Sequence, residues 1–114
     1  MKKLYGVITA MTTPFDSEGK LDLAALKEQT EFLIEKGVDC LYPCGTTGEM
    51  FLCSAEERKQ IAETVVKTAA GRVTVFIHVG AMTQAETIEL ARHAQSIGAD
   101  GIGVVTPTYF NVDD

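Results

Sequence analysis

Three helical segments of this chain end at a glycine, and an apolar strand follows each glycine within a few residues. The three glycines are Gly37, Gly71 and Gly98. Glycine commonly ends a helix because it adopts the left-handed backbone conformation at little cost. A crossover long enough to contain a helix brings the next strand back parallel to the one before it. The repeated pattern therefore predicts an α/β fold with about four parallel strands and three helices.

The positions of these elements follow from the hydrophobic periodicity. We expect strands at residues 5–11, 38–42, 73–77 and 102–106. We expect helices that begin near Leu23, Ser54 and Thr83 and that end at the three glycines. Ser54 with Glu57, and Thr83 with Glu86, have the spacing of a capping box, which marks a helix start. The strands are almost continuously apolar, which is typical of a sheet covered on both faces.

Two architectures share this order of elements: an open doubly wound sheet, and a (β/α)8 barrel of about 250 residues. An open nucleotide-binding sheet usually has a glycine-rich turn after its first strand. Here Thr-Thr-Pro-Phe-Asp follows at residues 12–16, which is not a phosphate loop. The pattern therefore favours the N-terminal half of a TIM barrel. We expect residues 1–114 to form a partial barrel domain, strands 1 to 4, with the remainder of the barrel absent from this chain.

The charge balance limits the classes of partner. The chain has 10 Lys+Arg against 16 Asp+Glu, a formal net charge of −6, and no basic run. This argues against binding to nucleic acid or to an anionic membrane surface. The longest apolar stretch is far shorter than the ~20 residues of a membrane helix, and no signal peptide is recognised after Met1.

The chain contains three cysteines, Cys40, Cys44 and Cys53. An odd number of cysteines without an export signal favours reduced thiols, so we expect a cytoplasmic protein. Their spacing is not a common zinc pattern. We interpret Cys40 as strand core and the other two as small residues of a loop and a helix entry.

The most informative segment is Gly-Thr-Thr-Gly-Glu at residues 45–49, just after the second expected strand. Parallel α/β folds bind ligands at the carboxyl ends of their strands. The glycines let the backbone turn tightly and approach a ligand closely. The amides and hydroxyls of Thr46 and Thr47 could then donate to a carboxylate or phosphate oxygen. An ordinary strand-to-helix turn, stabilised by threonine and glutamate, is the alternative interpretation.

Three further side chains follow expected strands at the same end of the sheet. The phenol of Tyr109 could pass protons or hold a carbonyl oxygen, or the ring could pack as a lid on its loop. His78 is either an acid–base group or a structural histidine, and Glu49 is either a base or a partner of backbone amides. No Asp, His or Cys cluster has the spacing of a metal site. We therefore expect no metal and no cofactor.

Several of these motifs together resemble the dihydrodipicolinate synthase/N-acetylneuraminate lyase family. They are Gly-Thr-Thr-Gly-Glu at residues 45–49, Ser-Ala-Glu-Glu-Arg at 54–58 and Val-Thr-Pro-Thr-Tyr at 105–109. Phe-Asp-Ser-Glu-Gly at 15–19 is also similar to the family's entry into its first helix. The resemblance covers essentially the whole chain, in order and in spacing.

The resemblance implies a (β/α)8 barrel that assembles as a homo-oligomer, usually a tetramer. It also implies a class I aldolase, in which a lysine on the sixth strand forms a Schiff base with pyruvate. The bound pyruvate then adds to an aldehyde, or is released by retro-aldol cleavage. By this resemblance Thr46 and Thr47 hold the pyruvate carboxylate. Thr46 and Tyr109 belong to a proton relay, and Tyr109 reaches into the active site of a neighbouring subunit.

No lysine of this chain suits the role of the Schiff-base lysine. The lysines lie at the N-terminus, in a turn or on expected helices; they are Lys2, Lys3, Lys20, Lys27, Lys36, Lys59 and Lys67. A Schiff-base lysine needs a desolvated or cation-paired position that lowers its pKa. The family's strand-5 tyrosine and strand-6 lysine would lie beyond Asp114. We therefore expect the chain to hold the carboxylate site without the nucleophile, and to be inactive alone.

We interpret the chain as a fragment of a pyruvate-dependent aldolase, with dihydrodipicolinate synthase as the leading specific function. That enzyme condenses pyruvate with aspartate semialdehyde in lysine biosynthesis. Thr46 favours the synthase, because the lyases tend to have serine there, whereas residues 50–52 and 108–111 depart from the synthase pattern. One alternative is an N-acetylneuraminate lyase-like or other 2-oxo acid aldolase. Another is a non-catalytic half-barrel that acts by association through its open edges.

Overall fold

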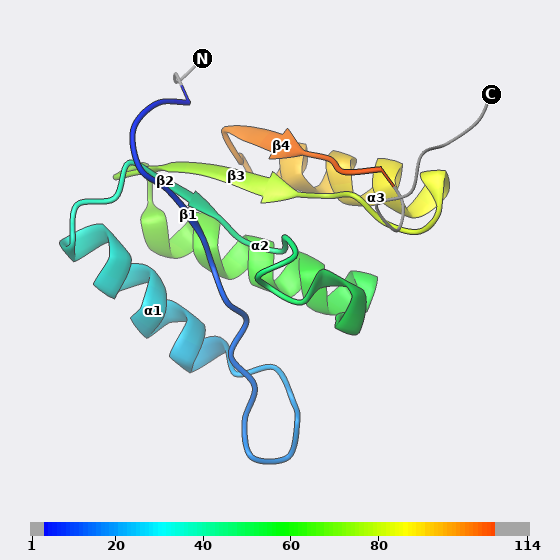
Figure 1. Cartoon of the computed structure of the whole chain (residues 1–114), viewed down its shortest axis with the longest axis horizontal. Helices are drawn as coiled ribbons and strands as arrows, with labels where there is room; N and C mark the ends of the chain where they lie inside the picture. Colours follow the sequence, from blue (N-terminus) through cyan, green and yellow to red (C-terminus); the bar gives the residue numbers. More distant parts are fainter. Residues whose placement is uncertain (1–3, 107–114) are drawn as a thin grey trace.

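Strands and helices alternate along residues 4–106, the part of the chain that the computed structural model describes (Figure 1). The strands are β1 (Ile8–Ala10), β2 (Cys40–Tyr42), β3 (Thr74–His78) and β4 (Gly101–Gly103). The helices are α1 (Leu23–Glu35), α2 (Ala55–Ala69) and α3 (Gln84–Ser96), and a short 3-10 turn, η1 (Met50–Leu52), precedes α2. Every expected strand and helix is present. The turn η1 lies where the sequence indicated only a loop.

The four strands form one parallel sheet in the order β1-β2-β3-β4. The pairs that fix the register include Ile8–Cys40, Cys40–Thr74 and Phe76–Gly101. Consecutive strands are therefore neighbours, and the carboxyl ends of all four lie along one edge of the sheet (Figure 1).

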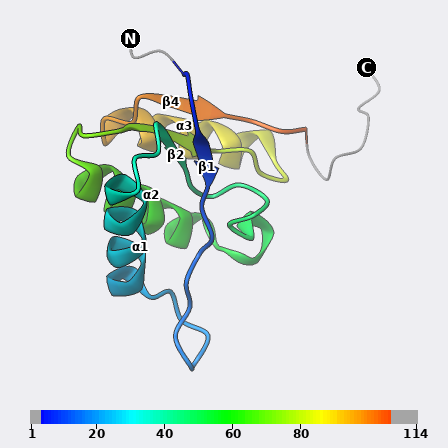
Figure 2. The same ribbon diagram turned by 60° about the vertical axis from the view of Figure 1, so that its left-hand side comes forward.

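The three helices lie on one face of the sheet, where α1 contacts α2 and α2 contacts α3 (Figure 1 and Figure 2). Right-handed crossovers between sequential neighbours place every helix on the same face. An open doubly wound sheet would instead carry helices on both faces and reverse its strand order. The sequential order and the single helical layer confirm the expected fold class, the first half of a (β/α)8 barrel.

The opposite face of the sheet carries no helix from residues 4–106, so the expectation of a sheet covered on both faces is wrong for this part of the chain. Ile8 is 44% exposed. A hollow of about 300 Å³ on this face is lined by Leu4, Ile8, Tyr42, Phe76, Ile102 and Gly103. A closed barrel fills its inner face with side chains from its own strands. Almost continuously apolar strands therefore do not require a second layer of helices.

The hydrophobic core lies between the sheet and the helical layer. Its members from the strands are Leu41, Val75 and Ile77, and those from the helices include Leu26, Ile61, Val65, Ala69, Leu90 and Ala94. Burying one large aliphatic side chain contributes about 1.5–3 kcal/mol. The helical face is therefore the stabilised side of the described sheet. No helix within residues 4–106 has the length and apolar character needed to cross a membrane.

The helix ends follow the sequence signals closely. Ser54 and Glu57 make both hydrogen bonds of a capping box, at 2.9 and 3.1 Å. Thr83 accepts from the Glu86 N–H at 3.2 Å. At the end of α2 the left-handed turn begins at Ala70 (φ 48°), one residue before the expected Gly71.

All three cysteines are free and buried. Cys40 lies in β2, Cys44 in the loop that follows, and Cys53 between η1 and α2, as the sequence interpretation expected. Burial raises the pKa of each thiol, and that of Cys44 rises to about 12. The thiolate is the reactive form of cysteine, so these positions combine poor access with little thiolate.

We therefore expect the native chain to resist thiol reagents. At about pH 8, near the ordinary cysteine pKa, an aromatic disulfide reagent should label the native protein only on the timescale of its unfolding. All three thiols should react once guanidinium has unfolded the chain. An Ala85→Cys variant, which places a thiol at an exposed position of α3, should react at once and serves as the positive control. A rapidly labelled native cysteine in the unmodified chain would contradict the buried arrangement.

Candidate functional site

The loop between β2 and α2 carries Thr46 and Thr47 at the carboxyl edge of the sheet. Both threonines are exposed, whereas the flanking Gly45 and Gly48 are buried. The loop is closed by two backbone hydrogen bonds: the Glu49 N–H donates to the Thr46 carbonyl at 2.9 Å, and the Met50 N–H donates to the Gly45 carbonyl at 3.2 Å. The hydroxyl-bearing side chains therefore project from a tight turn whose backbone is packed.

The turn depends on residues other than its two glycines. The left-handed conformations belong to Cys44 (φ 65°) and Glu49 (φ 58°), which flank the segment. The expectation that Gly45 and Gly48 supply the turning is therefore wrong. Gly48 instead permits a close approach to the end of β1, because a Cβ there would lie 3.1 Å from the Met11 carbonyl oxygen.

Thr13 anchors this loop from the side of β1. Its hydroxyl donates to the Gly48 carbonyl at 2.6 Å, and the side chain is buried. Close by, the Met11 N–H donates to the Tyr42 carbonyl at 3.1 Å, which extends the pairing of β1 and β2 toward the loop. The sequence analysis did not identify Thr13. Its only signal was a threonine directly before a proline at the end of the first strand.

The turn offers hydrogen-bond donors that no group of the described residues uses. Within residues 4–106, the backbone N–H groups of Thr46 and Thr47 have no recorded acceptor. Both residues also carry a hydroxyl and are exposed. Amides and hydroxyls of this kind suit an anionic oxygen. The role of Thr46 and Thr47 as a carboxylate site stays a prediction.

His78 ends β3 at the same edge, and the structure gives it a structural position. Its side chain is 4% exposed, and its ring packs edge-on against Tyr42 with 6.0 Å between centroids. The backbone N–H of His78 donates to the Pro43 carbonyl at 3.2 Å, which ties the end of β3 to the start of the threonine loop. Burial, and then the nearby charge of Arg58, lower the pKa of the ring, while a hydrogen bond with the Cys44 backbone opposes the shift.

Arg58 is the residue of this edge that the sequence analysis missed as a site residue. It lies on α2 and is 4% exposed, and its guanidinium donates to the carbonyls of His78 and Gly80, both at 2.8 Å. A signal was available, because Arg58 falls on the same helical face as the apolar Ile61 and Ala62. A charged residue in an apolar stripe indicates a buried polar contact.

Tyr109, the third expected site residue, lies outside the described residues. Glu49 is exposed and its carboxylate does not cap η1, so the structure does not place it among backbone amides as the sequence analysis suggested. No group of three or more His, Cys, Asp or Glu within residues 4–106 could hold a metal ion.

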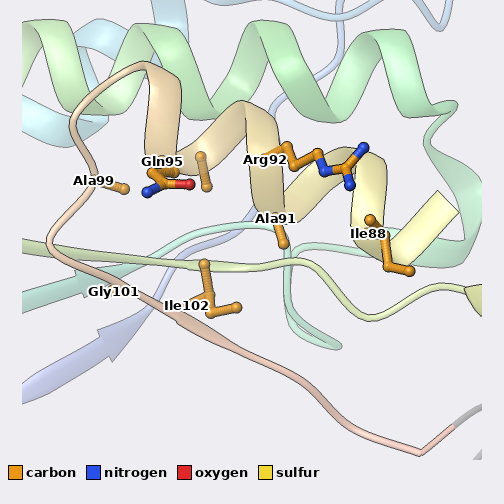
Figure 3. A pocket seen from close by; sticks show the side chains of 8 residues that line it. Ile88, Ala91, Arg92, Gln95, Ala99, Gly101 and Ile102 are labelled. Atoms are coloured by element: carbon orange, nitrogen blue, oxygen red, sulfur yellow. The ribbon is translucent and has the colours of Figure 1, made fainter. Parts of the chain in front are cut away.

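An apolar hollow of about 400 Å³ between α3 and β4 is not part of this site (Figure 3). Ile88 and Ala91 of α3 face Ile102 of β4 across it. Its lining also includes Ala99 and Gly101, at the amino end of β4 and therefore at the opposite end of the sheet from Thr46. Arg92 and Gln95 are the polar side chains of its lining, and the other lining residues are apolar or glycine.

The lowered pKa of His78 makes the stability of the chain depend on pH. The unfolded chain takes up a proton below the ordinary histidine pKa of about 6.5, where the native ring stays neutral. The free energy of unfolding should therefore fall as the pH drops through this range. Urea denaturation at a series of pH values should show this slope, and His78→Gln should flatten it. His93, which pairs with Glu63 on the surface, is retained in both proteins, so equal slopes would rule out His78 as the source.

The chain matches a known family over almost its whole length. The profile of the Dihydrodipicolinate synthetase family matches residues 3–114. An N-acetylneuraminate lyase from Citrobacter koseri is 43% identical over 109 residues, which are 96% of this chain and 37% of that protein.

Solved structures agree with this match. The dihydrodipicolinate synthase from Aquifex aeolicus superposes with a TM-score of 0.87 at 41% identity, covering 91% of this chain and 35% of that one. A prophage protein of the dihydrodipicolinic acid synthase family from E. coli K12, solved in complex with pyruvate, gives a TM-score of 0.91 at 41% identity, covering 96% of this chain and 37% of that one. The chain thus spans little more than a third of the relatives that it matches. With the parallel half-barrel, the threonine loop at its carboxyl edge and a family match from residue 3 to residue 114, the chain belongs to the dihydrodipicolinate synthetase family.

Proposed function

We propose that residues 1–114 form a partial barrel domain that supplies the carboxylate-binding part of a pyruvate-dependent class I aldolase. The observation that carries this proposal is the turn at Thr46 and Thr47, with two adjacent amides and two exposed hydroxyls at the carboxyl edge of a parallel sheet. Such a set of donors suits the carboxylate of a small 2-oxo acid. The relative solved with pyruvate supports the same ligand.

In this proposal a lysine outside residues 1–114 attacks the pyruvate carbonyl, and the resulting carbinolamine loses water to give a Schiff base. Loss of a proton from the pyruvate methyl group gives an enamine, whose carbon attacks an aldehyde, and the new alkoxide takes up a proton. Hydrolysis of the product Schiff base then releases the product and frees the lysine. Cleavage is the reverse sequence. Thr47 holds the carboxylate, while Thr46 both contacts it and passes the proton in a relay with Tyr109.

The lysines of the described residues give independent support to an external nucleophile. None of them lies in a strand; they are Lys20, Lys27, Lys36, Lys59 and Lys67. A Schiff-base amine must be available in its neutral form, which requires a lowered pKa. Lys59 shows the opposite, because its hydrogen bond to Glu89 raises its pKa.

The aldehyde distinguishes two candidate reactions. The sequence analysis favours dihydrodipicolinate synthase, which condenses pyruvate with aspartate semialdehyde. The curated relatives named N-acetylneuraminate lyase favour cleavage of a sialic acid as the second candidate. Both reactions use the same pyruvate site. Assays of the catalytically complete barrel, meaning this chain with the strands that complete it, should show turnover with one of these aldehyde partners. We further propose that this barrel acts as a homo-oligomer, as the resemblance implies.

Replacing Thr46 by valine should separate proton transfer from binding in that complete barrel. Valine keeps the shape and the backbone donors but removes the hydroxyl. General acid–base steps contribute about 10²–10⁴-fold, so kcat should fall by about that factor with a smaller change in the KM for pyruvate. Thr47→Val should mainly raise that KM. Thr74→Val, at the amino end of β3, is the matched control and should leave both constants unchanged. A near-normal kcat in Thr46→Val would remove the hydroxyl from the relay.

Borohydride should not trap a Schiff base between pyruvate and a lysine of this chain alone. Reduction of a Schiff base would leave a stable pyruvyl group on one lysine, and intact-mass measurement would detect it. We expect no stoichiometric adduct, because no described lysine has a suitable environment. A catalytically complete member of the family, treated in parallel, is the positive control. A full single adduct on an internal lysine of this chain would contradict the proposed division of roles.

A further inference from the structure

Arg58 occupies a costly position for a charged side chain. It is 4% exposed on the face of α2 that packs against the sheet. No acidic side chain within residues 4–106 forms a recorded salt bridge with it, and in that part of the chain its Nε has no hydrogen-bond partner. A buried charge without a counter-ion destabilises a fold unless other contacts compensate it. The contacts made by the rest of the guanidinium therefore indicate why the charge is there.

Those contacts all lie at the end of β3. One terminal nitrogen donates to the Gly80 carbonyl and the other to the His78 carbonyl, both at 2.8 Å. The second nitrogen also lies 3.5 Å from Nδ1 of the His78 ring. A guanidinium is only a donor, so a hydrogen bond at this contact requires the ring tautomer that is protonated on Nε2.

Cys44 is the hinge from which the threonine turn departs. It has a left-handed conformation (φ 65°) and immediately precedes Gly45. Two further contacts hold the same place: the His78 N–H donates to the Pro43 carbonyl at 3.2 Å, and the Cys44 Sγ donates to the Arg58 carbonyl at 3.8 Å. A rotation at Cys44 would redirect the peptide groups that follow it, including the amides of Thr46 and Thr47.

We propose that Arg58 is a positioning residue of the carboxylate site: acting through the backbone of His78, it holds the segment at Pro43 and Cys44 in place and thereby aims the amides of Thr46 and Thr47. Arg58 does not touch the substrate and is not a catalytic residue. The inference rests on the proposed function, because the direction of these amides matters for activity only if they bind a carboxylate.

The first arm of the test needs no substrate. In the full 114-residue chain, NMR should follow the backbone amides of Thr46 and Thr47 and the titration of His78. Arg58→Met should move both amide resonances and raise the pKa of His78, because a nearby positive charge is lost. The titratable groups that the structure records against His78 are Arg58, Tyr42 and Cys44. Tyr42 and Cys44 are retained.

Two controls separate positioning from general destabilisation. Val65→Ala removes buried volume from the same helix and should lower stability without moving the Thr46 and Thr47 amides. Arg72→Met removes an exposed arginine that pairs with Glu31. It should change neither the Thr46 and Thr47 amide resonances nor the pKa of His78. If Arg58→Met does not fold, Arg58→Lys carries the test, since one ammonium cannot reproduce the fork that reaches both carbonyls and Nδ1.

The second arm uses the catalytically complete barrel. Arg58→Lys should raise the KM for pyruvate about tenfold, the effect of losing one well-aimed hydrogen bond, with a smaller change in kcat. Arg72→Met, the exposed-arginine control, should leave both constants unchanged.

The outcomes distinguish the two proposals. If the unaltered barrel does not use pyruvate, the proposed function is wrong. The NMR measurements on the 114-residue chain then test by themselves whether Arg58 positions the loop. If pyruvate is used but Arg58→Lys leaves both its KM and the two amides unchanged, the positioning role is wrong. An equal effect of Arg72→Met on the KM would also overturn it.

Discussion

The buried guanidinium of Arg58 joins three parts of the molecule that lie apart in the sequence: helix α2, the end of β3 and the loop after β2. A charge in this position must be compensated by oriented dipoles. The carbonyls of His78, the last paired residue of β3, and of Gly80, just beyond it, supply such dipoles. The packing of α2 against β3 and the shape of the threonine loop therefore depend on the same few hydrogen bonds.

The direction of the strands explains why these groups meet at all. Each right-handed crossover returns the chain to the same end of the sheet, so the segments after β1, β2 and β3 emerge side by side. Thr13 then holds the loop from one side, and His78 with Arg58 holds it from the other. The exposed threonines lie between two fixed neighbours, and only their outer surface is left for a ligand.

The architecture was predictable because its signals are local and repeated. Glycines at helix ends and the capping box at Ser54 depend on neighbouring residues, and each is found within one residue of the expected position; α2 turns at Ala70, just before Gly71. The contacts of Arg58 and Thr13 were not predictable in this way. Both join residues far apart in the chain, and both end on backbone carbonyls, which leave no trace in the identity of the partner residue. The sequence analysis also misassigned the left-handed positions of the loop. They belong to Cys44 and Glu49 rather than to its glycines.

The conformation of Cys44 has a consequence for how the proposed carboxylate site would receive a ligand. A residue with a side chain costs about 1–2 kcal/mol in the left-handed region, and here the surrounding hydrogen bonds keep it there. The turn is therefore already shaped when no ligand is present, and little conformational entropy remains to be lost on binding. Such a site favours rapid, rigid-body capture of a small anion, with affinity limited by the few contacts that the anion makes rather than by reordering of the loop.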